Sequence, residues 1–380
     1  MAYVDPLNTM RSTEWKKLKL HDLCKINYGQ SPNGILDQNG KYPVVGTSNV
    51  TRKGKDYFVD GETIIIGRKG SIDKPFYFSE KIWVIDTAFF TSEHKNLNCK
   101  WLYYYLENSK LSRLNESTGV PSLSRTTLYN LDVMCPPIFE QQKISDILST
   151  WDRAIEQVQR LIEAKQRQKI KLVSQLLSGQ KRFPGFQDEW KQVKLGTFLH
   201  PKFRKVVKPA GAYLRLGIRS HGKGTFTSVV DDPETIALTH LFQARKDDLI
   251  VNITFAWEGA IALVGPDGDG ALVSHRFPTY VLDISKMLPE YFKHLMVTDR
   301  FFYELDLISP GGAGRNRVMN KGDFLKIMVT IPGVEEQKKI AGVLGGMDEQ
   351  IDLLKKYLVK IKEQKKGLMQ KLLTGEIRVK

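Results

Sequence analysis

Apolar residues recur every seven positions in two stretches of the chain, a pattern typical of coiled-coil helices. In the first stretch the two series are Ile144, Trp151, Val158, Lys165 and Leu172, with Leu148, Ile155, Ile162, Lys169 and Leu176. In the second they are Ile340, Met347, Leu354, Ile361 and Leu368, with Leu344, Ile351, Leu358, Lys365 and Leu372. A helix of about 34 residues is roughly 50 Å long. This length favours a projecting rod over an amphipathic helix packed on its own domain.

The two stretches are copies of one another. Aligning Ile144 with Ile340 gives an offset of 196 residues that holds without a gap as far as Gly179 and Gly375. A weaker match, "EWKKLKLHDL" from Glu14 against "EWKQVKLGTF" from Glu189, has an offset of 175. The chain therefore reads as two copies of a domain followed by a long helix, with the second domain 21 residues longer.

The repeat predicts four segments. They are a first domain over 1–142, a helix over 143–180, a second domain over 181–336 and a helix over 337–376. Prolines before each helix, Pro136, Pro137 and Pro332, set the boundary. Because the second helix must run back from the second domain, we expect an antiparallel pair that holds two similar domains apart, related by a pseudo-twofold axis.

Each domain shows the same series of shorter elements. The first offers strands at "GETIIIG" and "KIWVID", a helix at "WLYYYLENSK", and a polar loop before the strand "NLDVMCPP". The second offers strands at "DDLIVNI", "GAIALVG" and "PTYVLD", a helix at "PEYFKHLMVTDRFF", and a Gly-rich loop before "FLKIMVTIP". Strands and helices do not alternate regularly, so the predicted class is α+β (mixed α/β), not a doubly wound sheet. Gly345 and Gly346 predict a bend or a close helix contact near the start of the second long helix.

The net charge of +15 suggests an anionic partner such as nucleic acid. Residues 143–182 carry a net +5 and residues 338–380 a net +6, so the helical segments hold +11 of the +15. These charges are either solvated faces of an exposed coil or docking surfaces. Three widely spaced cysteines and the lack of a long apolar run predict a soluble protein of the cytosol.

Catalytic motifs are missing from the sequence. It has no Walker loop, no CxxC, no HxxxH pair, no GxSxG elbow and no methyltransferase motif, and "GGAGRN" follows a helix instead of a strand. We therefore predict no catalytic residue and no metal site on this chain.

Base-reading candidates are Arg, Lys, amide, hydroxyl and ring side chains on polar loops, because Arg pairs with guanine edges and amides pair with adenine edges. Simple solvation competes as the explanation for each residue taken singly. In the first domain the candidates are Gln30, Ser31, Asn49, Arg52, Lys53, Arg68, Lys69, Ser71, Ser124 and Arg125. In the second they are Arg215, Arg219, His221, Lys223, Thr254, Trp257, His275, Arg276, Arg315, Asn316 and Arg317.

The chain resembles the specificity subunits of type I restriction-modification systems. The resemblance rests on the doubled plan, on "PPIFEQQKI" and "IPGVEEQKKI" at the helix starts, on "LLSG" and "LLTG" at the helix ends, and on "GVPSLSRTTLYNLDV" before the first helix. The loop "GGAGRNRVMNKGDFLKI" is a looser version of the last motif.

That resemblance implies two target recognition domains, each reading half of a bipartite double-stranded DNA sequence, with the coiled coil setting the spacer. It also implies two modification (methyltransferase) subunits that bind S-adenosylmethionine, and restriction (translocase) subunits that use ATP and Mg²⁺. No cofactor is expected on this chain, nor any membrane. Three alternatives remain open: an architectural coiled-coil protein that binds DNA without sequence preference, a recognition subunit of a related restriction family, and a self-sufficient methyltransferase.

Overall fold

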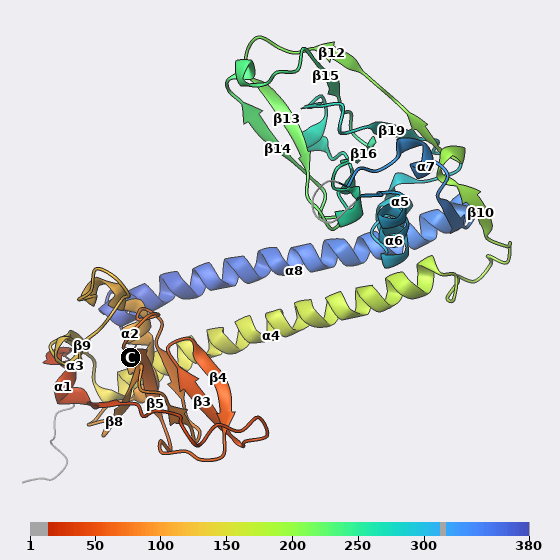
Figure 1. Ribbon diagram of the computed structural model, residues 1–380. Helices are drawn as coiled ribbons and strands as arrows, with labels where there is room; N and C mark the ends of the chain where they lie inside the picture. Colours follow the sequence, from red (N-terminus) through yellow and green to blue (C-terminus); the bar gives the residue numbers. More distant parts are fainter. Residues whose placement is uncertain (1–13, 312–316, 380) are drawn as a thin grey trace, which may run out of the picture. The chain divides into compact units, whose positions relative to one another are not determined.

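The chain forms two compact units in the computed structural model, which describes residues 14–311 and 317–379. Unit 1 contains Met1–Arg160 and Lys356–Lys380, and unit 2 contains Leu161–Lys355. The two long helices, α4 (Ile138–Leu177) and α8 (Val334–Thr374), are each shared between the units (Figure 1). The four-segment division stays a prediction, because the compact units cut both helices instead.

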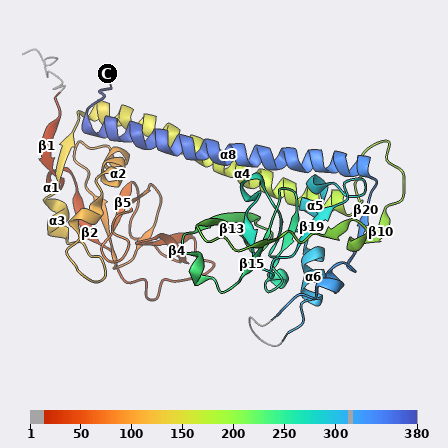
Figure 2. The same cartoon turned by 90° about the horizontal axis from the view of Figure 1, so that it is seen from above.

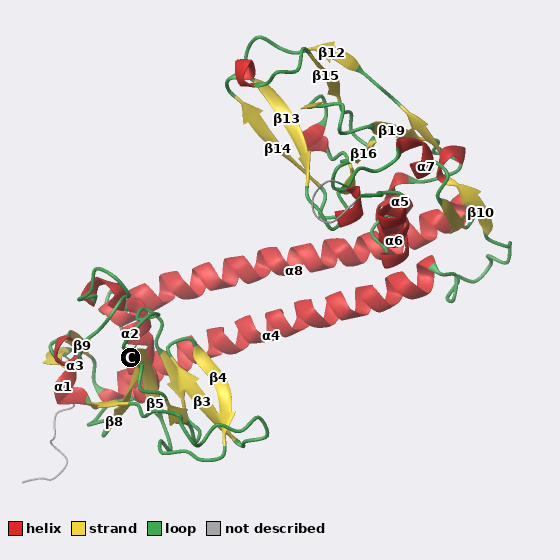
Figure 3. Ribbon diagram, viewed as in Figure 1, coloured by secondary structure: helices red, strands yellow, loops and turns green. Residues whose placement is uncertain are grey.

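Unit 1 contains three small sheets and short helices (Figure 3). Its four-stranded sheet has the order β2-β8-β5-β6, its three-stranded sheet the order β4-β3-β7, and β1 pairs with β9. The strands are β1 (Lys16–Lys19), β2 (Lys25–Tyr28), β3 (Tyr42–Gly46), β4 (Asn49–Gly54), β5 (Thr63–Gly67), β6 (Phe76–Phe78), β7 (Trp83–Val84), β8 (Ala88–Ser92) and β9 (Asp132–Cys135). The short α-helices are α1 (Leu20–Leu23), α2 (Cys99–Asn108) and α3 (Arg125–Tyr129).

Unit 2 repeats this plan and enlarges it. The pair β10-β20 corresponds to β1-β9, and the sheet β11-β19-β16-β17 corresponds to β2-β8-β5-β6, while the remaining sheet has five strands in the order β12-β15-β18-β13-β14. The strands are β10 (Lys191–Lys194), β11 (Leu199–Pro201), β12 (Lys205–Val207), β13 (Tyr213–Ile218), β14 (Thr225–Val230), β15 (His240–Gln243), β16 (Leu249–Val251), β17 (Ile261–Leu263), β18 (Leu272–Val273), β19 (Thr279–Leu282) and β20 (Met328–Ile331). The helices are α5 (Pro289–Leu295), α6 (Asp299–Leu307) and α7 (Lys321–Phe324).

The structure confirms the α+β class and the two long helices predicted from the heptads. Every predicted heptad position on α4 and α8 is buried or half-buried. Within each unit the helices run antiparallel: Asp152 pairs with Lys365 at 2.6 Å in unit 1, and Lys169 pairs with Asp348 in unit 2. Two lysines at heptad core positions, Lys365 and Lys169, are therefore matched by aspartates of the facing helix, and the third, Lys165, donates to Gln350.

The repeated helix-start motif makes the same contacts in both units. Gln141 Nε2 donates to the carbonyl of Pro136 and Gln337 Nε2 to that of Pro332. The side-chain oxygen of each glutamine accepts the backbone N–H at the start of the helix packed beside it, from Asn98 before α2 and from Leu288 before α5. The motif thus joins a long helix to the domain that precedes it.

A buried glutamate in the same motif joins the start of one long helix to the chain that follows the end of the other. Glu140 accepts hydrogen bonds from the guanidinium of Arg378 and from the indole of Trp15. Glu336 accepts the equivalent bonds from Arg182 and Trp190. Burial raises the pKa of Glu140, but the bonds from Arg378, the backbone of Val379 and Trp15 outweigh it and lower the pKa.

The "LLSG" and "LLTG" motifs end the long helices against these tryptophans. Gly179 and Gly375 have φ of +72° and +78°, the left-handed conformation that glycine adopts without strain. The ring of Trp190 lies 3.6 Å from the position of a Cβ on Gly179, and that of Trp15 lies 3.5 Å from one on Gly375. A glycine therefore terminates each helix and lets the indole pack on its end.

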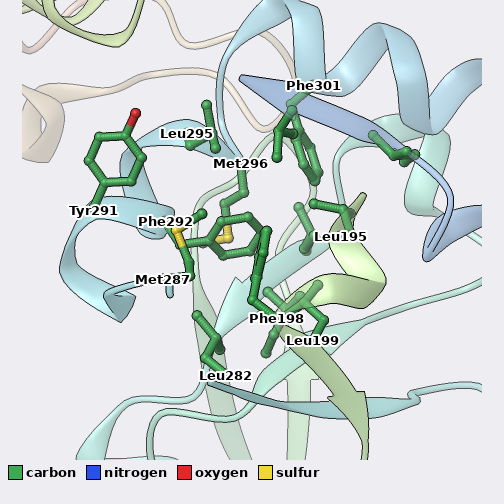
Figure 4. Packing of buried hydrophobic residues seen from close by; sticks show 14 of the residues in the cluster. Leu195, Phe198, Leu199, Leu282, Met287, Tyr291, Phe292, Leu295, Met296 and Phe301 are labelled. Atoms are coloured by element: carbon green, nitrogen blue, oxygen red, sulfur yellow. The ribbon is translucent and has the colours of Figure 1, made fainter. Parts of the chain in front are cut away.

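Each unit has a main core built around both long helices. In unit 2 aromatic side chains of α5 and α6, among them Phe292 and Phe301, pack against Phe198 (Figure 4). Leu176 near the end of α4 and Ile340 near the start of α8 belong to the same cluster. The unit 1 core contains the equivalent helix residues, Leu372 and Ile144. Figure 2 shows the long helices from a second direction.

One local prediction is wrong, and one of two alternatives in a second prediction is excluded. The helix expected over 289–302 is two helices, because Thr298 has an extended backbone and its hydroxyl accepts the N–H of Phe301 to start α6. Gly345 and Gly346 lie inside the unbroken helix α8, and no neighbour approaches within 4 Å of where a Cβ would stand. They therefore mark no close helix contact.

We predict that Glu336→Gln lowers the free energy of unfolding by about 2–3 kcal/mol, because Arg182 and Trp190 lose a charged acceptor that is almost fully buried. Urea unfolding followed by circular dichroism measures the loss. The matched control is Glu363→Gln on the same helix, an exposed site where we expect a change within about 0.5 kcal/mol. Equal midpoints for the two variants would contradict a structural role for Glu336.

His294 predicts a pH dependence of stability. Its ring is buried beside Lys293, Asp348 and Lys169, and burial lowers its pKa to about 4. The neutral form stabilises the fold above the ordinary pKa of 6.5, and this contribution is lost as the pH falls toward 4. The free energy of unfolding should fall by up to about 3 kcal/mol between these two pH values because of His294, and we expect His294→Phe to remove this fall. Melting curves between these pH values test it, with exposed His200→Phe as the control that leaves the slope unchanged.

Candidate nucleic-acid interface

Three loops of unit 1 meet at one end of the sheet β2-β8-β5-β6. They follow β2, follow β5 and precede α3, and they carry most of the base-reading candidates of the first domain. Gly70 N–H donates to the carbonyl of Pro121, Leu123 N–H donates to that of Arg68, and Lys69 forms a β-bridge with Ser122. The fold thus brings together residues that are about fifty positions apart in the sequence.

A stack of two arginines on one tyrosine lies in the middle of these loops. The guanidinium groups of Arg68 and Arg125 lie 5.3 Å and 5.0 Å from the ring centroid of Tyr28, which is 46% exposed. The sequence indicated both arginines but not the tyrosine, whose position at the end of β2, two residues before Gln30, was the available signal. We call this feature the Arg68–Tyr28–Arg125 stack.

The other candidates of unit 1 lie on three different features. Gln30 is held by its backbone, whose N–H donates to Val84 and whose carbonyl accepts the Trp83 indole. Asn49, with φ of +87°, forms the turn of the β3-β4 hairpin, and Arg52 and Lys53 are exposed along β4. Ser31 and Ser71 are exposed on their loops.

Ser124 has a structural role. Its hydroxyl accepts the N–H of Thr127 as the N-cap of α3 and donates to Glu116. Those bonds use its hydrogen-bonding capacity inside the unit, which argues against its direct contact with a base.

Unit 2 assembles four loops in the corresponding place. The segment 252–259 after β16 is central: Ile253 N–H donates to Arg276, Met319 N–H donates to Ile253, and His221 N–H donates to Glu258. Thr254, Trp257, His275 and Arg276 therefore come close to the β13-β14 turn, which carries Arg219, His221 and Lys223. Arg215 lies on β13, where its Nε donates to the Ser228 hydroxyl.

Arg317 makes several contacts within the unit. Its guanidinium donates to the carbonyls of Ser309 and Asp306, pairs with the Asp306 carboxylate at 2.7 Å and stacks 5.0 Å from the Trp257 ring centroid. It therefore braces this loop, and its contact with a base stays a prediction. Arg315 and Asn316 lie outside the described residues.

The repeat contains a candidate that the sequence interpretation missed. Lys321 follows the cap residue Asn320 of α7 as Arg125 follows the cap residue Ser124 of α3, and both pairs are related by the 196-residue offset. Lys321 Nζ lies 3.4 Å from the carbonyl of His275, inside the same group of loops. The alignment of the two copies was the signal that could have found it.

The described residues contain no group of three or more His, Cys, Asp or Glu side chains placed to hold a metal ion. Across residues 14–311 and 317–379, no helix combines the length and apolarity needed to cross a membrane.

The doubled α+β domain, the antiparallel long helices and the loop-built basic surfaces define a class: DNA specificity proteins with two recognition domains. A family model, the type I restriction modification DNA specificity domain, matches residues 12–166 and 188–363. The chain belongs to this family and is a specificity subunit of a type I restriction-modification system.

Individual relatives agree with this assignment. The type I restriction enzyme MjaVIII specificity subunit of Methanocaldococcus jannaschii is 23% identical over 401 aligned residues, covering 97% of this chain and 94% of the relative. The crystal structure of the S subunit from M. genitalium superposes with a TM-score of 0.63 at 16% identity, covering 96% of this chain and 98% of that one. A chain from a structure on complex assembly and conformational transition of the type I system gives a TM-score of 0.57 at 13% identity, over 99% of this chain and all of that chain.

We predict that Tyr28→Ala weakens DNA binding by about fivefold to tenfold, because both arginines lose the ring that orients them. Tyr28→Phe keeps the ring and should bind within about twofold of the natural protein. Fluorescence anisotropy with target duplex, repeated over a range of salt concentrations, measures both. Equal losses in the two variants would show that the hydroxyl, rather than the stack, matters.

Proposed function

We propose that each unit reads one half of a bipartite double-stranded DNA sequence. The observation that carries the proposal is that equivalent sheet ends present different groups: the Arg68–Tyr28–Arg125 stack in unit 1, and the loops of Arg219, Arg276 and Lys321 in unit 2. Arginine and amide side chains on such loops can contact base edges in the major groove. A common frame with different loop residues suits two different half-sites. The individual base contacts of all the candidate residues remain predictions.

The long helices set the distance between the half-sites in this proposal. A helix of 40 residues, the length of α4, is about 60 Å long, equivalent to about 18 base pairs. This is the upper limit of the spacing that the helices alone would set.

We further propose that two modification subunits dock on the long helices. The repeated contacts of Glu140 and Glu336, and of Asp152 and Asp348, give the long helices the same internal support in each unit, which suits docking of two identical partners. α8 exposes Tyr357 and Val359 on two different sides, among its lysines. We favour the modification subunits over DNA phosphates as the partner of this basic surface.

The chemistry belongs to those partners in this proposal. The modification subunits would bind S-adenosylmethionine and methylate adenine, and restriction subunits would use ATP and Mg²⁺. This chain would be non-catalytic and would act in the cytoplasm, which its three buried free thiols suit.

Two other functions make different predictions. An architectural protein without sequence preference would protect all DNA equally, whereas the proposed function requires protection of one split site. A recognition subunit of a related restriction family would copurify with different partner subunits.

The test lengthens the helix pair. Duplicating residues 154–160 in α4 and the facing residues 357–363 in α8 adds one heptad to each helix, about 10 Å. We expect both half-sites to stay the same while the spacer grows, by at most about 3 base pairs. Single-molecule sequencing of methylated adenines, in cells that also supply the modification subunits, reads the result.

The matched control duplicates the heptad in α4 alone, which leaves the two helices unequal and should abolish methylation. A changed half-site sequence in the double insertion would contradict the separation of reading from spacing.

A further inference from the structure

Unit 2 contains a cavity of about 520 Å³ beneath the β13-β14 hairpin. Its volume lies within the range of about 300–1,000 Å³ found for ligand sites and far exceeds the roughly 30 Å³ that one water occupies. Exposed Arg215 and Phe226 contribute to its lining, so the cavity reaches the surface of the unit.

The lining has two chemically different parts. The aliphatic part comes from Leu216, Leu238, Leu241 and Leu272. The rings of Phe255 and Phe277 add flat apolar surface. The polar part comes from loop residues: Ser220, Asn252, Glu258 and Ser274. A planar heterocycle has flat apolar faces and polar edges, so this lining matches a nucleobase better than an aliphatic chain.

The polar groups keep hydrogen-bonding capacity for a ligand. Asn252 uses its side-chain oxygen to accept the N–H of Thr254, and its amide nitrogen has no partner among the described residues. Glu258 uses Oε2 to accept the Ser220 hydroxyl, and its Oε1 has no partner in the described part of the chain. One donor and one acceptor of this kind suit the hydrogen-bonding edge of a base.

The polar lining residues are neighbours of the candidate DNA contacts. Ser220 lies between Arg219 and His221, Glu258 follows Trp257, and Ser274 precedes His275. The polar part of the lining therefore comes from the same loops that would meet the DNA. This position favours a base that is still part of a DNA strand over a free metabolite.

We propose that the cavity of unit 2 receives one nucleobase that has left the stack of the bound DNA. This inference rests on the proposed function, because it requires unit 2 to bind its half-site. Capture of an unstacked base would add to the sequence specificity that base-edge contacts provide, because the free energy of unstacking depends on the base and its neighbours.

The experiment uses the full chain and a duplex that carries the split site found by methylation mapping. Each adenine on either strand of the unit 2 half-site is replaced in turn by 2-aminopurine, and each cytosine by pyrrolo-deoxycytidine, so that every analogue keeps its Watson–Crick partner. Every base pair contains an adenine or a cytosine, and the fluorescence of both analogues increases when they or their pairing partners leave the stack. We expect a severalfold rise at one position on binding, without modification subunits present.

Two cavity-filling variants, Ile236→Trp and Leu238→Phe, test where the base goes, because both residues line the cavity and are half-buried. Each should abolish the rise while protection of the unit 1 half-site persists. Val229→Phe, on the same sheet but outside the cavity lining, is the matched control that should keep the rise. Thermal melting confirms that each variant is folded, and the two independent substitutions keep the test valid if one variant fails to fold.

The outcomes separate this inference from the proposed function. Site protection without a fluorescence rise at any position, or a rise that survives in both filled variants, overturns the capture of a base. A free nucleoside is the other possible ligand, and saturation-transfer NMR with the four deoxynucleosides tests it. If the protein binds a nucleoside, the filled variants lose this binding, and the duplex shows no fluorescence rise, then the cavity is a nucleoside site. That result also overturns the inference. Absence of any sequence-specific protection overturns the proposed function itself.

Discussion

The buried carboxylates of Glu140 and Glu336 are the contacts on which the architecture depends. Each lies at the start of one long helix and accepts hydrogen bonds from an arginine that follows the end of the other helix and from a tryptophan that precedes the domain. A buried carboxylate needs several donors to offset its lost hydration. Because these donors include an arginine that follows the other long helix, each unit closes only when both long helices are in place.

This constraint explains why the chain can be symmetric in its helices and different in its domains. The contacts that hold each domain to the helices are repeated residue by residue, down to the glycine that lets the indole pack on each helix end. The loops at the far end of each main sheet are under no such constraint. Unit 1 presents an exposed tyrosine between two arginines, whereas unit 2 has a larger second sheet with a cavity beneath its hairpin.

Small differences inside the repeated frame show how far the symmetry extends. Tyr104 on α2 donates its hydroxyl to Asp152, and on α5 the buried His294 lies near Asp348, the equivalent aspartate. Ser149, which contacts Tyr104, is replaced in the second copy by Gly345, so the second site has no hydroxyl there. The aspartate–lysine pairs are kept in both units while their neighbours vary, which leaves the unit 2 site sensitive to pH.

The sequence by itself determined the elements whose pattern is long and local. Heptads over five repeats, the prolines and glycines at helix ends, and the 196-residue offset predicted two long helices, their antiparallel course and the α+β class. Short strands such as β18, the break at Thr298 and the bracing role of Arg317 were decided only in the tertiary structure. The physical reason is the sequence distance over which the contacts form. A heptad pattern recurs every two helical turns, so it can be recognised locally. The role of a loop residue depends on partners distant in the sequence, as Tyr28 shows between Arg68 and Arg125.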